Sequence, residues 1–358
     1  MKTYIKFIIS QFVKNFLYVF LIIFSFVFIL NILSELEFFR DFDKTSTFLP
    51  IYLSILNSPS LIFEMFPFII LLSIQVFFIN LFKDNQIQIF KYSGLKNSKI
   101  IIILGTITFV IGVFAIVFFY NFSSKLKNVY LEIKNNYSSD DKYLAVITKN
   151  GLWIKDITND KINIIHSSGI EKNHLINSFI TEFDNEFNIQ KNISSDKINI
   201  INNEWLAYEA RLIKDNSSEK INNYKIFSNF DYKKIQSLFS NLSSLSLMKL
   251  HELRKNYIIL KYSTTEVSIQ ILKILTFPVY LTLMTILSSI IMFSTKSLSS
   301  TSLKISIGLF FSVIIYYLNN FFNILGKTEK ISIIMSISIP IIILIIANTI
   351  VIKNINEK

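Results

Sequence analysis

The sequence predicts an α-helical membrane protein that crosses the bilayer six times and carries an all-β, jelly-roll-like domain between its third and fourth spans. Three observations lead to this fold class. Six long stretches of the 358-residue chain contain no charged residue. The mean hydropathy, +0.47, is too high for a soluble protein. One long polar segment with alternating apolar positions, from 125 to about 260, separates the first three stretches from the last three.

Each uncharged stretch is long enough to cross a bilayer, which takes about 20 apolar residues in a helix. A charge at the bilayer centre costs about 2.5–3.5 kcal/mol on insertion scales, so six such stretches are not expected by chance. The first stretch exceeds the apolar region of a signal peptide, and we expect it to be retained. The stretches cover 15–34, 65–82, 100–124, 274–295, 305–326 and 331–352.

The predicted organisation has three parts. Residues 1–124 hold the first three spans with a short cytoplasmic helix at about 84–95, residues 125–260 form the β domain, and residues 261–358 hold the last three spans. Lys and Arg in the short loops are more numerous on the side of the two termini. Because positively charged loops stay in the cytoplasm, both termini are predicted there and residues 125–265 outside, in the periplasm of a two-membrane bacterium.

The polar segment reads as strands because short apolar alternations recur with turn residues between them. We expect strands at 143–147, 152–154, 161–166, 175–183, 186–190, 197–201 and 204–213, in a sandwich or jelly roll. From about Asp231 the spacing becomes helical and predicts a helix that leads to the fourth span. An edge of such a sheet either accepts a matching β domain of another chain or stays solvated.

Composition and motifs exclude several functions. The formal net charge is +11, but the basic residues lie between apolar runs and form no nucleic-acid footprint. There is no cysteine, so disulfides and Cys-ligated metals are excluded. The sequence has no P-loop, no H-E-x-x-H and no G-x-S-x-G, and its three histidines lack metal-ligand spacing. We therefore expect no catalytic residue, no metal and no cofactor.

Two further stretches suggest contacts. In the cytoplasmic loop, Ile87, Phe90 and Tyr92 give a short helix one apolar side, and Gly94 is placed to end it. Such a helix either docks into a soluble partner or only packs under the spans. Near the outer end of the fifth span, Tyr316, Asn319 and Asn320 either line the mouth of a polar cavity or make ordinary interfacial and interhelical contacts.

The chain resembles the lipopolysaccharide export permeases LptF and LptG over essentially its whole length. The loop Gln86–Gly94 is similar to the family's coupling helix, with Lys91, Ser93 and Gly94 in place. The stretch 151–155, which begins Gly-Leu-Trp, and the end of the fifth span, 316–322, are similar to the G-type subunit. These two stretches favour the G-type over the F-type subunit.

The resemblance implies a non-catalytic transport subunit in the bacterial inner membrane. It would pair with an LptF-like paralogue, be driven by an LptB-like cytoplasmic ATPase dimer, and pass lipopolysaccharide to a periplasmic jelly-roll protein of the LptC or LptA type. The implied ATPase-coupling residues are Gln86, Ile87, Phe90, Lys91, Ser93 and Gly94. The implied contacts to the lipid cavity or head group are Arg40, Lys44, Asn319, Asn320 and Tyr316.

The sequence departs from the family pattern at two places. Gln86 stands where the family usually has a Glu, so a charged contact to the ATPase is lost there. Glu35 and Glu37 occupy the outer end of the first span, where basic residues are common, and only Arg40 and Lys44 follow. The alternatives are an LptF-type subunit of the same complex, a membrane scaffold without transport, and a lipid-modifying membrane enzyme.

Overall fold

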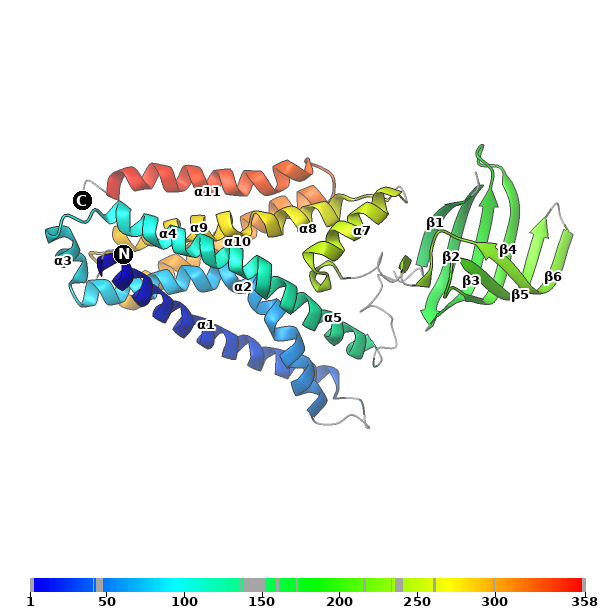
Figure 1. Ribbon diagram of the computed structural model, residues 1–358, viewed down its shortest axis with the longest axis horizontal. Coiled ribbons are helices and arrows are strands. Elements are labelled where there is room, and N and C mark those ends of the chain that lie inside the picture. Colours follow the sequence, from blue (N-terminus) through cyan, green and yellow to red (C-terminus); the bar gives the residue numbers. More distant parts are fainter. Residues whose placement is uncertain are drawn as a thin grey trace. The chain divides into compact units, whose positions relative to one another are not determined.

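The computed structural model describes residues 3–40, 42, 48–135, 137, 152–158, 161–171, 173–214, 217–232, 234–235, 241–259, 262–298 and 300–355. The chain divides into two units, each described here by itself. One comprises Met1–Lys127 with Thr265–Lys358, and the other comprises Asn128–Thr264. The first unit is helical, and the second contains a β-sheet (Figure 1).

The helical unit contains six helices long and apolar enough to cross a membrane, which confirms the six predicted spans. They are α1, α2, the continuous helix α4–η1–α5, α9, α10 and α11. The bounds are α1 (Thr3–Phe38), α2 (Phe48–Lys83), α3 (Gln86–Tyr92), α4 (Asn97–Phe114), the π-helical η1 (Ala115–Tyr120), α5 (Asn121–Asn135), α8 (Thr265–Leu275), α9 (Phe277–Ser294), α10 (Thr301–Lys327) and α11 (Ile333–Ile355).

Helix α2 is longer than the stretch that predicted it. It begins at Phe48 and passes through Pro59, Glu64 and Pro67 without interruption. A charge near the end of a span stops the apolar stretch but not the helix, and proline is tolerated where neighbouring helices support the backbone. The uncharged residues 65–82 are therefore only the second half of α2.

Helices α2 and α9 form the centre of this unit. In each helix we compare the apolar stretch of 18 residues. Of this stretch 56% is buried in α2 and 67% in α9, but only 17% in α1 and in α10. Helix α2 contacts α1, α3, α9 and α10. The spans α1 and α10 therefore lie at the periphery and leave most of their apolar surface uncovered.

Hydrogen bonds between amide side chains join α1 to α2 at two levels. The Asn31 Nδ2 atom donates to the Ser54 carbonyl at 3.1 Å, and Asn57 Nδ2 donates to Asn31 Oδ1 at 3.1 Å. Near the other end, Asn80 Nδ2 donates to Asn15 Oδ1 at 3.1 Å. In hydrocarbon the hydrophobic effect does not hold helices together, so such bonds and close packing take its place.

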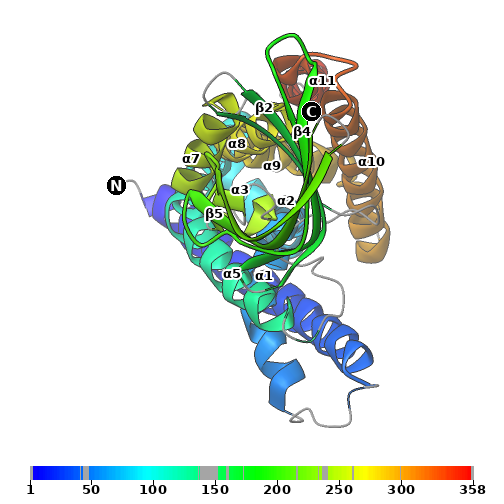
Figure 2. The same cartoon turned by 90° about the vertical axis from the view of Figure 1, so that its right-hand side faces the viewer.

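The second unit is built on one antiparallel sheet in which every strand pairs with its neighbour in sequence, in the order β1 to β6. Figure 2 shows the sheet strongly curved. A short η2 (Leu242–Ser244) and α7 (Leu247–Ile259) follow it. The strands are β1 (Leu152–Thr158), β2 (Lys161–Glu171), β3 (His174–Phe183), β4 (Ile189–Asn199), β5 (Glu204–Lys214) and β6 (Ser217–Phe227).

The predicted fold class is confirmed, but the strands differ in part from those predicted. The separate strands predicted at 186–190 and 197–201 are wrong, because one strand, β4, covers the polar residues between them and pairs on both sides. Strand β6 was not predicted, since most of its residues are polar and exposed. The strand predicted at 143–147 lies outside the described residues. The described strands make a single sheet of consecutive hairpins rather than the two facing sheets of a sandwich.

A row of isoleucines crosses the buried face of the sheet. Ile154, Ile165, Ile180 and Ile193 are paired in register on β1 to β4, and each is at most 2% exposed. β-branched side chains in such cross-strand pairs are the main stabilising contacts of a sheet. Trp205 of β5 is fully buried, and its Nε1 donates to the Phe230 carbonyl at 2.7 Å.

The buried face shifts by one residue along a line that crosses three strands. Successive buried residues in a strand normally lie two positions apart. In each of these strands one pair lies three positions apart: Leu175 and Ser178 in β3, Ser195 and Ile198 in β4, and Ala207 and Ala210 in β5. Asn177 and Glu209 lie within these steps with φ of 47° and 46°. The register of the strands is the same on both sides of this line, so the ladder is interrupted there without an extra residue in any strand.

Two buried serines replace the ladder hydrogen bonds lost along this line. Ser167 Oγ lies 2.8 Å from the Gly169 carbonyl and 2.7 Å from the Ile176 carbonyl. Ser195 Oγ repeats the pattern, at 2.9 Å from the Lys197 carbonyl and 2.6 Å from the Tyr208 carbonyl. Each hydroxyl bridges two strands where the backbone cannot.

We predict that Ser195→Ala destabilises the second unit by about 1–3 kcal/mol, because it leaves buried carbonyl groups without a donor. Both tryptophans, Trp153 and Trp205, lie in this unit, so urea unfolding of the full chain followed by tryptophan fluorescence reports on it alone. Ser194→Ala on the opposite face is the matched control and should change stability by less than about 0.5 kcal/mol. Equal effects of the two substitutions would contradict the bridging role.

Candidate coupling and lipid-handling sites

The short helix α3 is held between two left-handed residues. Asn85, with φ of 54°, makes the sharp turn from α2 into α3. At the other end Gly94 has φ of 77°, the Leu95 N–H donates to the Phe90 carbonyl at 2.9 Å, and the Gly94 N–H donates to the Lys91 carbonyl at 3.0 Å. This is a Schellman ending, which places glycine where a side chain would be strained.

One side of α3 packs on the helical unit. Ile87 is 2% exposed, and the Phe90 ring lies 6.1 Å from the Phe7 ring of α1. Leu95 is buried in the same apolar cluster. Ile87 and Phe90 thus face inward as predicted from the pattern.

The opposite side of α3 exposes large apolar side chains. Tyr92 is 89% exposed and Ile89 is 62% exposed, while Gln88 and Lys91 beside them are also exposed. The prediction that Tyr92 shares the inner side with Ile87 is wrong, because α3 turns about 100° per residue and the inner side is already filled by Phe90. Ser93 and Gly94 follow on the exposed surface.

A carboxylate lies beside the first residue of α3. The Gln86 Nε2 atom is 3.3 Å from Asp84 Oδ2, and Asp84 is exposed. The position that departs from the family pattern therefore lies next to an acidic side chain two residues earlier.

The residues implied for lipid contacts do not form one cluster in the described structure. Arg40 follows the end of α1, and Lys44 lies outside the described residues. Tyr316, 62% exposed, and Asn320 are exposed on α10, whereas Asn319 is partly buried and hydrogen-bonded to Tyr280 of α9. Asn319 therefore makes an interhelical contact, one of the alternatives that the sequence left open.

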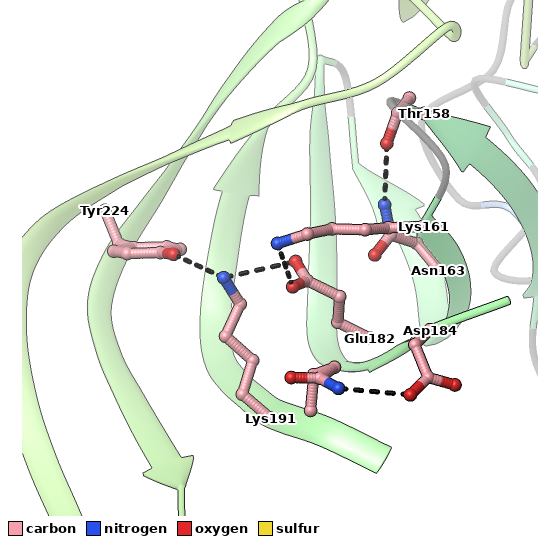
Figure 3. A network of polar contacts seen from close by, with 8 residues as sticks. Thr158, Lys161, Asn163, Glu182, Asp184, Lys191 and Tyr224 are labelled. Carbon is pink, nitrogen blue, oxygen red and sulfur yellow. Dashed lines mark hydrogen bonds and ion pairs between the residues drawn. The ribbon is translucent and has the colours of Figure 1, made fainter. Parts of the chain in front are cut away.

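A polar network joins four strands of the sheet (Figure 3). Glu182 of β3 accepts from Lys161 Nζ at 2.8 Å and from Lys191 Nζ at 3.1 Å. Lys191 of β4 also donates to the Tyr224 hydroxyl of β6 at 3.0 Å. Strands β4 and β6 are separated by β5, so these side chains meet on the inner side of the curve.

The hydrogen bonds of this network favour the charged forms of Glu182 and Lys191. Burial alone would raise the pKa of the Glu182 carboxyl, but the hydrogen bonds from Lys161 and Lys191 outweigh it and hold the pKa below its usual range. Burial likewise opposes the charge of Lys191, but its bonds to Tyr224 and Glu182 raise its pKa. Both groups are charged at neutral pH, so ion pairs contribute to holding these strands together.

Two sets of residues were not predicted from the sequence. The network was missed because its members come from β2, β3, β4 and β6, and pairing across non-neighbouring strands leaves no local pattern. Gln75 was also missed, although a glutamine inside an uncharged membrane stretch is a signal in itself. Its side chain is fully buried between α2 and α10.

The described residues contain no group of three His, Asp or Glu side chains that could hold a metal ion. Six helices able to span a membrane, a surface helix with an apolar exposed side and a separate sheet define the class of a multi-pass membrane protein with a β domain. A comparison with protein families matches residues 6–354 to the family described as "Lipopolysaccharide export system permease LptF/LptG". The chain belongs to this family.

A search of curated proteins gives no match. Membership of the family makes the chain a permease subunit of a lipopolysaccharide export complex that includes partner subunits. It also makes the chain a multi-pass protein of the inner membrane.

We predict that Glu182→Gln lowers the stability of the second unit by about 1–3 kcal/mol at neutral pH, since hydrogen bonds to charged groups contribute this much. Because the folded pKa of Glu182 lies below its unfolded value, the stabilisation is fully present above about pH 4.3 and is lost as the pH falls through the folded pKa. Tryptophan-detected urea unfolding should therefore give wild type and variant equal stability at low enough pH.

The control for this prediction is Glu219→Gln, which removes an exposed carboxylate from β6. It should change stability little at any pH. A difference between wild type and Glu182→Gln that persists unchanged into strong acid would contradict the ionic account.

Proposed function

We propose that this chain is the G-type permease subunit of an ABC transporter that extracts lipopolysaccharide from the inner membrane and passes it to a periplasmic jelly-roll bridge. A separate cytoplasmic ATPase dimer supplies the energy, and this chain does no covalent chemistry. The observation that carries the proposal is α3, because a rigidly capped surface helix that exposes Ile89 and Tyr92 has the form of a docking surface.

Several features support the cytoplasmic half of the proposal. The sequence has no P-loop, so ATP hydrolysis is expected in another chain. Asp84, hydrogen-bonded to Gln86, is placed to supply the negative charge that the family usually carries at position 86. The coupling residues are then Gln86, Ile87, Phe90, Lys91, Ser93 and Gly94, with Ile87 and Phe90 fixing the helix and the others near the partner.

The uncovered sides of α1 and α10 support pairing with a second permease subunit. A lipid with several acyl chains needs continuous apolar contact, because each CH₂ group moved into water costs about 0.8 kcal/mol. Two half-transporters that face each other through peripheral spans would enclose such a surface. Arg40, Lys44, Tyr316, Asn319 and Asn320 are proposed to lie near its outer end.

The sheet is proposed to receive the lipid on the far side of the membrane. Its edge strand β6 has one free side among the described strands, which suits addition of a strand from a partner jelly roll. With both termini in the cytoplasm, this unit lies in the periplasm. The F-type subunit of the same complex is the second candidate, and the Gly-Leu-Trp stretch at 151–153 favours the G-type.

We predict that Tyr92→Ala lowers recovery of the ATPase subunit with this chain by about tenfold or more, since loss of a central aromatic contact costs about 2 kcal/mol or more. The measurement is co-purification of the ATPase at fixed membrane amounts. Tyr92 is almost fully exposed, so its removal should leave the folding of the chain unchanged.

The matched control is Lys96→Ala, an exposed residue just beyond the helix. It should leave the recovery within about twofold. Undiminished recovery with Tyr92→Ala would show that α3 only packs under the spans, and the transport complex would then need another docking surface.

A further inference from the structure

One polar side chain lies deep between two spans. Gln75, in the middle of the uncharged half of α2, is fully buried, and its Nε2 atom donates to the Lys304 carbonyl of α10 at 3.1 Å. Its Oε1 atom has no hydrogen-bond partner among the described residues. Burying an amide in hydrocarbon costs free energy when only one of its two polar groups has a hydrogen-bond partner. Packing alone therefore does not explain why a glutamine occupies this position.

The contact depends on a glycine. A Cβ atom added at Gly308 would overlap the Gln75 amide group. In a regular helix the Lys304 carbonyl also accepts from the N–H of Gly308, one turn later. The absence of a side chain at 308 therefore opens the backbone of α10 to the amide from α2.

A second contact joins the same two helices nearer the cytoplasm. The Nζ atoms of Lys304 and Lys296 lie 5.5 Å and 5.9 Å from the centre of the Phe82 ring. Lys304 Nζ also lies 3.4 Å from the Lys296 carbonyl. Phe82 is near the end of α2, just before the turn into α3, and seven residues or about two turns from Gln75. Both contacts involve Lys304, one through its carbonyl and one through its side chain, so they hold the start of α10 on α2.

The rest of α10 is held differently. Lys304, Gly308, Ser312 and Ile315 are buried, but no residue from 316 to 325 is buried before Gly326. The cytoplasmic half of α10 is thus fastened to α2, and the following ten residues leave their sides uncovered or half-covered.

We propose that Gln75 is a positioning residue that fastens the first turns of α10 to α2, so that α2, α3 and the cytoplasmic half of α10 move as one rigid body during transport. This inference rests on the proposed function, because it takes α3 as the site where the ATPase acts. Displacement of α3 would then reach α10 through Phe82 and the Gln75–Gly308 contact, without passing through the other spans.

The test uses Gln75→Cys together with Gly308→Cys in a chain that has no other cysteine. A Cβ added at 308 would lie 2.5 Å from the Gln75 Cδ, which is one bond beyond the atom that a sulfur at 75 would replace, so the two thiols lie close enough to be oxidised to a disulfide. The complex with its ATPase and paralogue is reconstituted in vesicles that contain lipopolysaccharide. ATP-driven release to a soluble periplasmic acceptor is measured after oxidation and again after reduction.

If the helices move together, the disulfide forms and restores the fastening that the two substitutions remove, so release in the oxidised state is about tenfold higher than in the reduced state. Failure to form the disulfide, or release that oxidation leaves unchanged or lowers, would overturn the proposal, because fastening the two helices together would then not support transport. If the wild-type complex releases no lipid with ATP, the proposed function itself fails, which is a different result.

A second experiment measures the lipid released per ATP hydrolysed. Gly308→Ala displaces the Gln75 amide, and Gln75→Leu removes it, so each should lower this ratio about tenfold while ATP hydrolysis changes little. The double variant should be no worse than either single one. Gly105→Ala, where an added Cβ meets only an ordinary contact at 3.4 Å from Thr282, is the matched control and should keep the ratio within twofold. Additive losses, or loss of ATP hydrolysis itself, would contradict the positioning role.

Discussion

Polar groups inside hydrocarbon are the constraint on which this structure depends. The hydrophobic effect stabilises the association of apolar helices very little in lipid, because the acyl chains are as apolar as the helix side chains. The helices must be aligned by close packing and by hydrogen bonds that cross between them. Helix α2 carries many of these bonds: Asn80 to α1, Gln75 to α10, and the Leu71 carbonyl, which accepts from Ser288 of α9 at 2.9 Å. It is also the helix that runs into α3.

This arrangement relates the fold to transport. A helix at the centre of the unit, fixed to three others by polar contacts, is placed to transmit a displacement from the end that leads into α3. The peripheral spans α1 and α10, with most of their apolar surface uncovered, suit sliding contacts with lipid or a second subunit. The sheet is stabilised differently, by the contacts of Ser167 and Ser195 with neighbouring strands and by the ion pairs around Glu182.

The length of the uncharged stretches and the alternation of apolar residues predicted the spans and most strands well. A membrane span must be long and uncharged to cross the hydrocarbon core, so all six spans were found from the sequence. The alternation of apolar and polar residues located β1, β2, β3 and β5. The pattern failed where stabilisation is not local. Strand β6 is polar and exists because β5 offers it hydrogen bonds, and Tyr92 faces outward because Phe90 and Ile87 already fill the inner side.

The residues of the candidate sites were predicted less well than the fold. The short helix was located from its glycine and its apolar residues, but the side of the helix that stays exposed depends on tertiary packing. The ion pairs of Glu182 join strands far apart in sequence, and Gln75 was passed over because one amide does not interrupt an apolar stretch. Sequence patterns report which elements form, whereas contacts between them depend on geometry that only the folded chain supplies.

The central claim is that α3 and the sheet work on opposite sides of the membrane. Labelling with a membrane-impermeant maleimide tests it directly in a chain that has no cysteine of its own. In intact cells with a permeabilised outer membrane, Ser218→Cys in β6 should be labelled, and Ser93→Cys beside α3 should be labelled only after the inner membrane is opened. Labelling of the Ser93→Cys variant from outside, or protection of the Ser218→Cys variant, would contradict the account.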